Sequence, residues 1–214
     1  SFNKTTGLSV RALKVTSSKT DPTSGQTLGE KLQNVLDVSL ASGNGVGISA
    51  AVILPNGETW IGAGGVSYGT TKITKDMRFS AGSIEKMFTA ATIMQLAEEG
   101  KLKLDDPLDK WLPTYPYIDP KITVRQLLNH TGGLYDIVDN PDLWDAIFRE
   151  PAKFWNLEGI ILAFNREPVF PKGACWNYSQ VGYNLLQMII EKITGLEKTA
   201  HNRNRFFVPL GLSN

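Results

Sequence analysis

The chain contains two strand-like runs followed almost entirely by helical patterns, and this order constrains its fold more than any other feature. The largely apolar residues 46–54 and 59–66 flank Pro55-Asn56-Gly57. An Asn-Gly pair supplies the positive φ angles of a tight turn, so we predict a β-hairpin here. A two-stranded hairpin is only marginally stable alone. The sequence therefore predicts a sheet that other structure completes or covers.

Helical patterns account for most of the rest. The first predicted helix starts near Leu28 and ends at Gly43-Asn44-Gly45, and Thr123 with Gln126 forms a capping box for another. The predicted helices after the hairpin cover residues 83–99, 124–129, 142–149, 157–164 and 180–194. Gly100 and Gly195 are predicted to end the first and the last of these.

Composition excludes several classes of protein. There are 22 Lys and Arg against 21 Asp and Glu, without a basic stripe, so we do not expect nucleic acid as a partner. The longest apolar stretch, residues 46–54, is far shorter than the ~20 residues of a membrane-spanning helix. Cys175 is the only cysteine and there are two histidines, so we expect no intramolecular disulfide and no Cys/His metal site. We interpret Cys175 as a small buried apolar residue.

A serine and a lysine lie three residues apart at the start of the most apolar predicted helix. They are Ser83 and Lys86, and residues 87–97 are apolar on nearly every side, as in a helix enclosed by a core. Side chains at i and i+3 share a helix face, so the amine can reach the hydroxyl. A buried lysine readily gives up its charge and can then act as a general base. The pair predicts acyl transfer; the alternative is a core helix whose lysine stem covers apolar surface.

Several segments in order resemble the serine β-lactamase and D-alanyl-D-alanine carboxypeptidase superfamily, in its class C-like and esterase branch. A set of ordered segments is more specific than one tetrapeptide. Within residues 29–214 they read Phe79-Ser-Ala-Gly-Ser83-Ile-Glu-Lys86, Leu96-Ala-Glu-Glu-Gly100-Lys-Leu-Lys-Leu-Asp105-Asp-Pro-Leu, Ile122-Thr-Val-Arg-Gln-Leu-Leu-Asn-His130-Thr-Gly-Gly-Leu, Pro171-Lys-Gly-Ala-Cys-Trp-Asn-Tyr178-Ser-Gln180-Val-Gly-Tyr-Asn-Leu-Leu and Pro209-Leu-Gly-Leu.

The resemblance implies an α/β (α+β) β-lactamase/transpeptidase-like fold, in which helices flank an antiparallel sheet and a second subdomain is all-helical. The C-terminal strands are expected to be missing from this chain. We expect a flexible polar arm over residues 1–28, the N-terminal part of the α/β domain with the hairpin and nucleophile helix over 29–104, and a helical subdomain over 105–178. Helices that return to the α/β domain are expected over 179–214.

The resemblance also implies a covalent acyl-enzyme mechanism that uses no cofactor or metal. Ser83 would attack a β-lactam, a D-amino-acid peptide or amide, or a carboxylic ester, while Lys86 and Tyr178 share the proton transfers. The backbone N–H of Ser83, at a helix start, is the expected oxyanion donor. Without the family pattern, Tyr178 would be read as a buried core residue. Periplasmic or secreted location is favoured over cytoplasmic.

Two departures from the family pattern stand out. Gln180 occupies a position where the tripeptide that begins at Tyr178 usually ends in Asn; we expect it to bind Lys86 or a substrate amide with altered geometry. The family's third motif, Lys-Thr-Gly or His-x-Gly, does not follow Tyr178. His130-Thr131-Gly132 precedes it, and we interpret that turn as a helix end with glycine at the stop. A C-terminal complementing segment or second chain is the expected source of the third motif.

Two other functions stay open. A penicillin-binding or sensor protein that deacylates slowly would use the same residues, and Gln180 offers a reason for slow turnover. A catalytically silent binding module is compatible with the absent third motif. The fold does not choose among β-lactamase, D-amino-acid peptidase and esterase. Tyr135 follows the His130 turn and either overlooks the site or only packs there.

Overall fold

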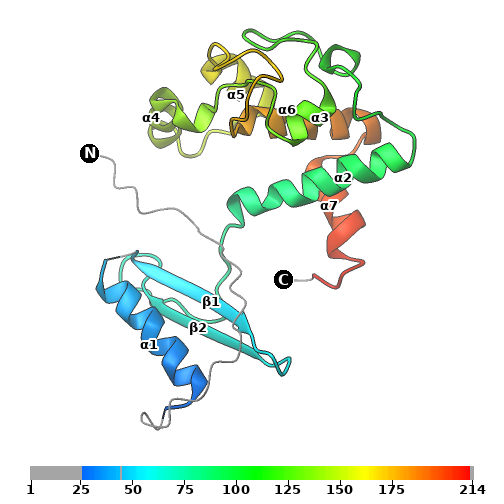
Figure 1. Cartoon of the computed structure of the whole chain (residues 1–214). Coiled ribbons are helices and arrows are strands. Elements are labelled where there is room, and N and C mark those ends of the chain that lie inside the picture. The colour runs from blue at the N-terminus through cyan, green and yellow to red at the C-terminus, as the bar shows by residue number, and fades with distance from the viewer. Residues whose placement is uncertain (1–25, 44, 213–214) are drawn as a thin grey trace. The chain divides into compact units, whose positions relative to one another are not determined.

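The computed structural model describes residues 26–43 and 45–212, and the chain divides between Gly82 and Ser83 into two compact units (Figure 1). The predicted arm over residues 1–28 lies almost wholly outside the described residues, as does Asn44. The α-helices and strands in the described residues are α1 (Leu28–Ala41), β1 (Gly47–Ile53), β2 (Thr59–Gly65), α2 (Lys86–Glu98), α3 (Val124–Leu128), α4 (Pro141–Arg149), α5 (Leu157–Phe164), α6 (Gln180–Thr194) and α7 (Lys198–Asn202).

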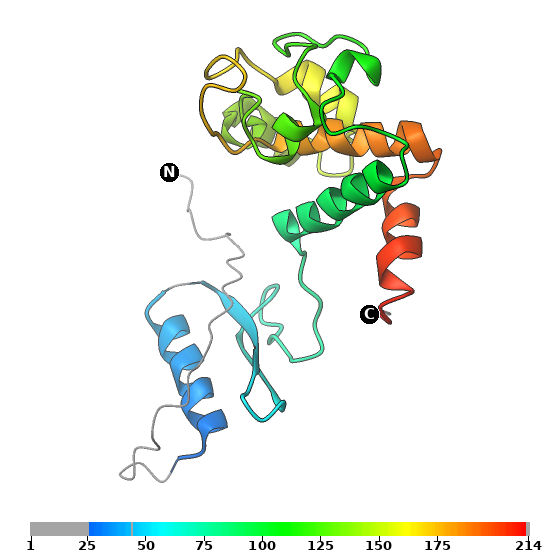
Figure 2. The ribbon, with the colours of Figure 1, turned by 45° about the vertical axis from the view of Figure 1, so that its right-hand side comes forward.

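The first unit consists of helix α1 packed on the β1–β2 hairpin. The strands pair antiparallel from Gly47 opposite Gly65 to Ile53 opposite Thr59, and Gly57 in the turn has a φ of 86°. The predicted hairpin is therefore confirmed, but only Gly57 of the Asn-Gly pair takes the positive φ that was expected of both residues. Figures 1 and 2 show α1 alongside both strands.

Helix and sheet approach each other closely at one glycine. A Cβ atom at Gly64 would lie 2.7 Å from the side chain of Leu40 and 2.8 Å from that of Leu36. A larger residue at this position would force these two leucine side chains to shift. Leu36 is the buried residue of α1, so the core of this unit depends on that close approach.

The second unit is built around α6. Val181, Leu185, Leu186 and Ile189 of α6 are fully buried. Helices α2, α3 and α5 pack on α6, and the views in Figures 1 and 2 agree with this arrangement. Gly195 ends α6 in the left-handed conformation with a φ of 67°, as predicted. The burial of these apolar side chains makes α6 a stable support for the residues that contact its first turn.

Helix α3 begins as predicted and ends differently. Thr123 and Gln126 form the predicted capping box, but His130, with a φ of 61°, takes the left-handed position after the helix. The expectation of a glycine at this stop is wrong. The glycine that the turn requires is Gly133, where φ is 73° and a Cβ atom would lie 2.1 Å from the carbonyl oxygen of Phe170.

Helix α2 differs from its prediction in two ways. Ser83 lies in a preceding 3-10 turn, η1 (Gly82–Glu85), and the α-helix starts at Lys86. The helix is also not enclosed, because Met87 is 64% and Met94 44% exposed. Its apolar pattern predicted burial all round, whereas the described residues cover chiefly the face of α2 that packs against α6.

Candidate active site

The turn that carries Ser83 brings its hydroxyl to Lys86. Successive turns of a 3-10 helix have three residues, so side chains at i and i+3 lie one above the other. The Lys86 ammonium donates a hydrogen bond of 3.2 Å to Ser83 Oγ. Ser83 is exposed and Lys86 is 9% exposed. The hydroxyl is therefore open to a ligand, while the cation is largely withdrawn from water.

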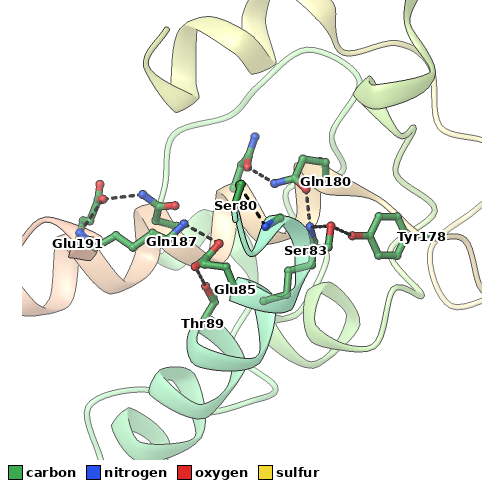
Figure 3. Close-up of polar contacts among 12 residues, drawn as sticks. Ser80, Ser83, Glu85, Thr89, Tyr178, Gln180, Gln187 and Glu191 are labelled. Carbon is green, nitrogen blue, oxygen red and sulfur yellow. Dashed lines mark hydrogen bonds and ion pairs between the residues drawn. The ribbon is translucent and has the colours of Figure 1, made fainter. Parts of the chain in front are cut away.

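Tyr178, two residues before α6, and Gln180, the first residue of α6, complete the group. The Tyr178 hydroxyl donates to Ser83 Oγ at 2.8 Å, and Gln180 Oε1 accepts from Lys86 Nζ at 2.5 Å. Figure 3 shows Tyr178 pointing at Ser83, with the Gln180 side chain on another side of Ser83. All four residues of the predicted site thus lie together, and all four belong to the second unit.

The surroundings of the Lys86 ammonium are polar but uncharged. Its hydrogen-bond partners in the described residues are the Ser83 hydroxyl and the Gln180 amide oxygen. The rings of Tyr178 and Tyr183 lie 5.0 Å and 5.5 Å from Nζ. Aromatic faces attract a cation without neutralising it. Lys86 Nζ is thus held by a hydroxyl, an amide oxygen and two aromatic rings.

His130 holds the segment that carries Tyr178. Its Nδ1 accepts a hydrogen bond of 3.2 Å from the backbone N–H of Ser179, and its ring lies 4.7 Å from that of Tyr178. Burial lowers the pKa of His130, the charge of Lys86 lowers it further, and Asp136 opposes the change. The neutral imidazole is the form that can accept at Nδ1. The His130 turn, interpreted from sequence as a plain helix end, is therefore also a contact of the site.

Glu85, between Ser83 and Lys86, anchors the nucleophile turn from two sides. It accepts a hydrogen bond of 3.0 Å from Thr89 and forms an ion pair of 2.6 Å with Lys198 at the start of α7 (Figure 3). These contacts restrain the turn against α2 and α7. A reacting side chain is held precisely only when neighbouring contacts restrain the segment that carries it.

The interpretation of Cys175 is wrong, whereas Tyr135 takes the second of its two predicted roles and packs. Cys175 is exposed, not buried, because it lies in the loop before Tyr178 and outside the core. Tyr135 packs against the core, and its backbone carbonyl accepts a hydrogen bond of 2.9 Å from Ser179. Its contribution to the site is thus packing and backbone support.

Neither a metal centre nor a membrane span is found in the described part of the chain. No group of three or more His, Cys, Asp or Glu residues between 26 and 212, Asn44 aside, is arranged to hold a metal ion. Among the same residues, no helix has the length and apolar character needed to cross a bilayer.

Comparison with known proteins defines the class to which this fold and site belong, the β-lactamase/transpeptidase fold. A D-stereospecific amidohydrolase from Streptomyces sp. superposes with a TM-score of 0.72 and 35% identity over 86% of this chain and 55% of its own. D-amino acid amidase from Ochrobactrum anthropi SV3 has a TM-score of 0.71 and 31% identity over 87% of this chain and 51% of its own. The predicted fold class is confirmed.

The family follows from the sequence match. The Beta-lactamase family model matches residues 32–214, so the chain belongs to this family. A penicillin-binding protein of Bacillus subtilis (strain 168) is 34% identical over 148 residues, which are 63% of this chain and 29% of the relative. The chain spans about half the length of the two solved amidohydrolases.

Proposed function

We propose that this chain carries the nucleophile and proton-transfer groups of a serine hydrolase that forms a covalent acyl-enzyme. The observation that carries the proposal is that Ser83 Oγ lies within hydrogen-bond distance of both Lys86 Nζ, at 3.2 Å, and Tyr178 Oη, at 2.8 Å. A serine hydroxyl is a weak nucleophile until a neighbouring base takes its proton, and two such neighbours lie here.

Acylation follows from this arrangement. The Ser83 proton passes to the neutral Lys86 amine or to a Tyr178 phenolate as Oγ bonds to the substrate carbonyl carbon. The negative charge that develops on the carbonyl oxygen is stabilised by the backbone N–H of Ser83, which lies in a first helical turn where N–H groups lack intrahelical acceptors. The same proton then passes to the leaving nitrogen or oxygen, its bond to carbon breaks, and an ester on Ser83 remains. Water hydrolyses that ester and restores the hydroxyl.

D-amino-acid amides or peptides are the substrates we propose. The solved relatives at 35% and 31% identity are a D-stereospecific amidohydrolase and a D-amino acid amidase. β-Lactams and carboxylic esters present the same electrophilic carbonyl and stay within the proposal. Because this chain spans about half of those relatives, we further propose that a C-terminal complementing segment or second chain supplies the third motif and the second oxyanion donor.

A slowly deacylating penicillin-binding protein is the second candidate. The identity to a penicillin-binding protein of Bacillus subtilis favours it, and Gln180 in place of Asn alters the group that binds Lys86. It shares the acylation step and differs in the lifetime of the acyl-enzyme.

Intact-protein mass spectrometry tests the proposal. The protein is incubated with a β-lactam and, separately, with a fluorophosphonate, beside a Ser83→Ala variant. One adduct per chain that forms only when Ser83 is present supports the acyl-enzyme, and its decay separates a hydrolase from a slowly deacylating protein. No adduct with either probe, or an equal adduct on Ser83→Ala, contradicts the catalytic assignment. The untreated spectrum shows whether a second polypeptide accompanies the chain.

A further inference from the structure

We propose that Asn184 is a positioning residue that holds the Gln180 carboxamide with its oxygen toward Lys86. The inference concerns the same Ser83–Lys86 pair and so rests on the proposed function for its catalytic consequence. The motif comparison pointed to Gln180 but gave no role to Asn184.

The geometry places the two amides in contact along α6. Gln180 Nε2 donates a hydrogen bond of 3.0 Å to Asn184 Oδ1, one helical turn further on. Asn184 is 5% exposed and lies in a helix whose neighbouring positions, Leu185 and Leu186, are fully buried. A polar side chain in such a place needs a hydrogen-bond partner, and Gln180 is one. The i, i+4 spacing allows this pairing without distortion of the helix.

The chemistry of the two ends decides which way the carboxamide points. A lysine ammonium has three donors and no acceptor, so only the amide oxygen can accept from it. The amide nitrogen must then find an acceptor elsewhere, and Asn184 Oδ1 provides one. With an apolar residue at position 184, Nε2 would lose this acceptor, and a flipped amide would turn a donor toward the Lys86 donor.

The orientation of Gln180 matters because it fixes the amine of Lys86. A neutral amine has two N–H groups and one lone pair. The ammonium donates to both Ser83 Oγ and Gln180 Oε1. In the neutral amine, an N–H that stays on Gln180 Oε1 leaves the lone pair on the side of Ser83 Oγ, where it can receive the serine proton. Asn184 touches neither the substrate nor the reacting atoms, and acts only through Gln180.

The contact also accounts for a glutamine at this position. Gln has one more rotatable bond than Asn, and fixing that bond carries an entropic cost. The backbone N–H of Gln180 is anchored to Asp136 Oδ1 at 3.0 Å, and the far end of its side chain is anchored to Asn184. The longer side chain is thereby restrained at both ends.

Substitutions at position 184 test the proposal in the full chain. Asn184→Leu removes the acceptor at similar volume, and Asn184→Asp keeps an acceptor oxygen. We expect Asn184→Leu to slow acylation of Ser83 by a fluorophosphonate about ten- to a hundredfold, because one hydrogen bond that places a reacting group is lost. Asn184→Asp should be acylated at a rate closer to that of the wild type. Asn165→Leu is the matched control, because Asn165 is 4% exposed and donates to the Pro116 carbonyl, away from the site.

The Gln180→Leu background supplies the second test. If Asn184 acts through Gln180, Asn184→Leu slows acylation no further once Gln180 is already Leu. The proposal is overturned if Asn184→Leu is acylated at the wild-type rate, or if the losses of acylation rate in the two single variants add up in the double variant.

Side-chain amide NMR separates a failure of this inference from a failure of the proposed function. If the wild-type chain is not acylated at all, the proposed function fails. The side-chain amide resonances of Gln180 then still report whether Asn184 holds the Gln180 carboxamide. A large shift of the Gln180 resonances in Asn184→Leu, absent in Asn165→Leu, supports the positioning role. Unchanged resonances overturn it.

Discussion

Tyr178→Phe separates catalysis from stability more cleanly than any other substitution in the site. It removes the hydroxyl that lies 2.8 Å from Ser83 Oγ and keeps the ring, with its contacts to His130 at 4.7 Å and Lys86 at 5.0 Å. The fold loses one hydrogen bond between partly exposed groups, so we expect the free energy of unfolding to fall by only about 0.5–1.5 kcal/mol. Loss of a positioned acid or base slows a reaction about 100- to 10,000-fold, which corresponds to about 3–5 kcal/mol of activation barrier.

The assay compares kcat/KM for a D-amino-acid amide and for the nitrophenyl ester of the same acyl group. An amine leaves only after it has gained a proton, whereas nitrophenolate leaves without one. If Tyr178 passes the proton to the leaving group, Tyr178→Phe loses activity on the amide by the full range above and loses much less on the ester. Equal losses on both substrates would assign Tyr178 to activation of Ser83 instead.

Tyr115→Phe is the matched control. The Tyr115 hydroxyl donates to Glu158 at 3.1 Å, outside the group formed by Ser83 and Lys86. Burial raises the pKa of Tyr115 to about 12, so this hydroxyl stays protonated. We expect a similar loss of stability and unchanged kcat/KM. A lost acid or base should reduce kcat/KM at least about 100-fold. If kcat/KM of Tyr178→Phe stays within a factor of about three of the wild type on both substrates, a catalytic role for Tyr178 is refuted.

The remaining predictions concern stability. Burial lowers the pKa of both histidines, His130 and His201, so the unfolded chain binds more protons than the folded chain as the pH falls below about 6.5. Urea unfolding should therefore show full stability above this pH and a loss of stability as the pH falls below it; a rise on acidification would contradict the assignment. Gly133→Ala should lower the melting temperature more than Gly195→Ala. Both glycines have a positive φ, but only at Gly133 would the new Cβ meet a backbone oxygen, that of Phe170 at 2.1 Å. Equal shifts in melting temperature would show that backbone strain from the positive φ dominates. Ile189→Ala removes a fully buried side chain and should cost about 2–5 kcal/mol in denaturant unfolding, and a loss below about 1 kcal/mol would mean that α6 is not the core of its unit.

The sequence predicted the elements whose signals are local. The Asn56-Gly57 turn, the Thr123–Gln126 capping box and the glycine that ends α6 each act within a few residues, and each is found where predicted. The Ser83–Lys86 pair is local in the same way. Tyr178 and Gln180 could be linked to that pair only through the family resemblance, because nothing within either segment indicates a partner more than 90 residues away.

The contacts that support the site were missed for a related reason. His130 contacts the Tyr178 segment through a fold that brings two loops together, and its left-handed φ replaces the expected glycine. Asn184 did carry a signal, since it is a polar residue four positions after Gln180 in a helix that is otherwise buried on that side. The exposure of Met87 and Cys175 could not be predicted because burial depends on which surfaces the rest of the chain covers.

The hydrogen bonds of the site differ greatly in the length of chain that they close. Ser83 and Lys86 are three residues apart, whereas the bonds from Tyr178 and Gln180 close loops of 95 and 94 residues. Contacts of such long range carry the entropic cost of closing a long loop and are lost when the elements between them come apart. A nascent or partly unfolded chain would therefore carry a serine beside a lysine but without the tyrosine and the amide. Reactivity would be confined to molecules whose helical unit has finished folding, so labelling of Ser83 would count correctly folded chains.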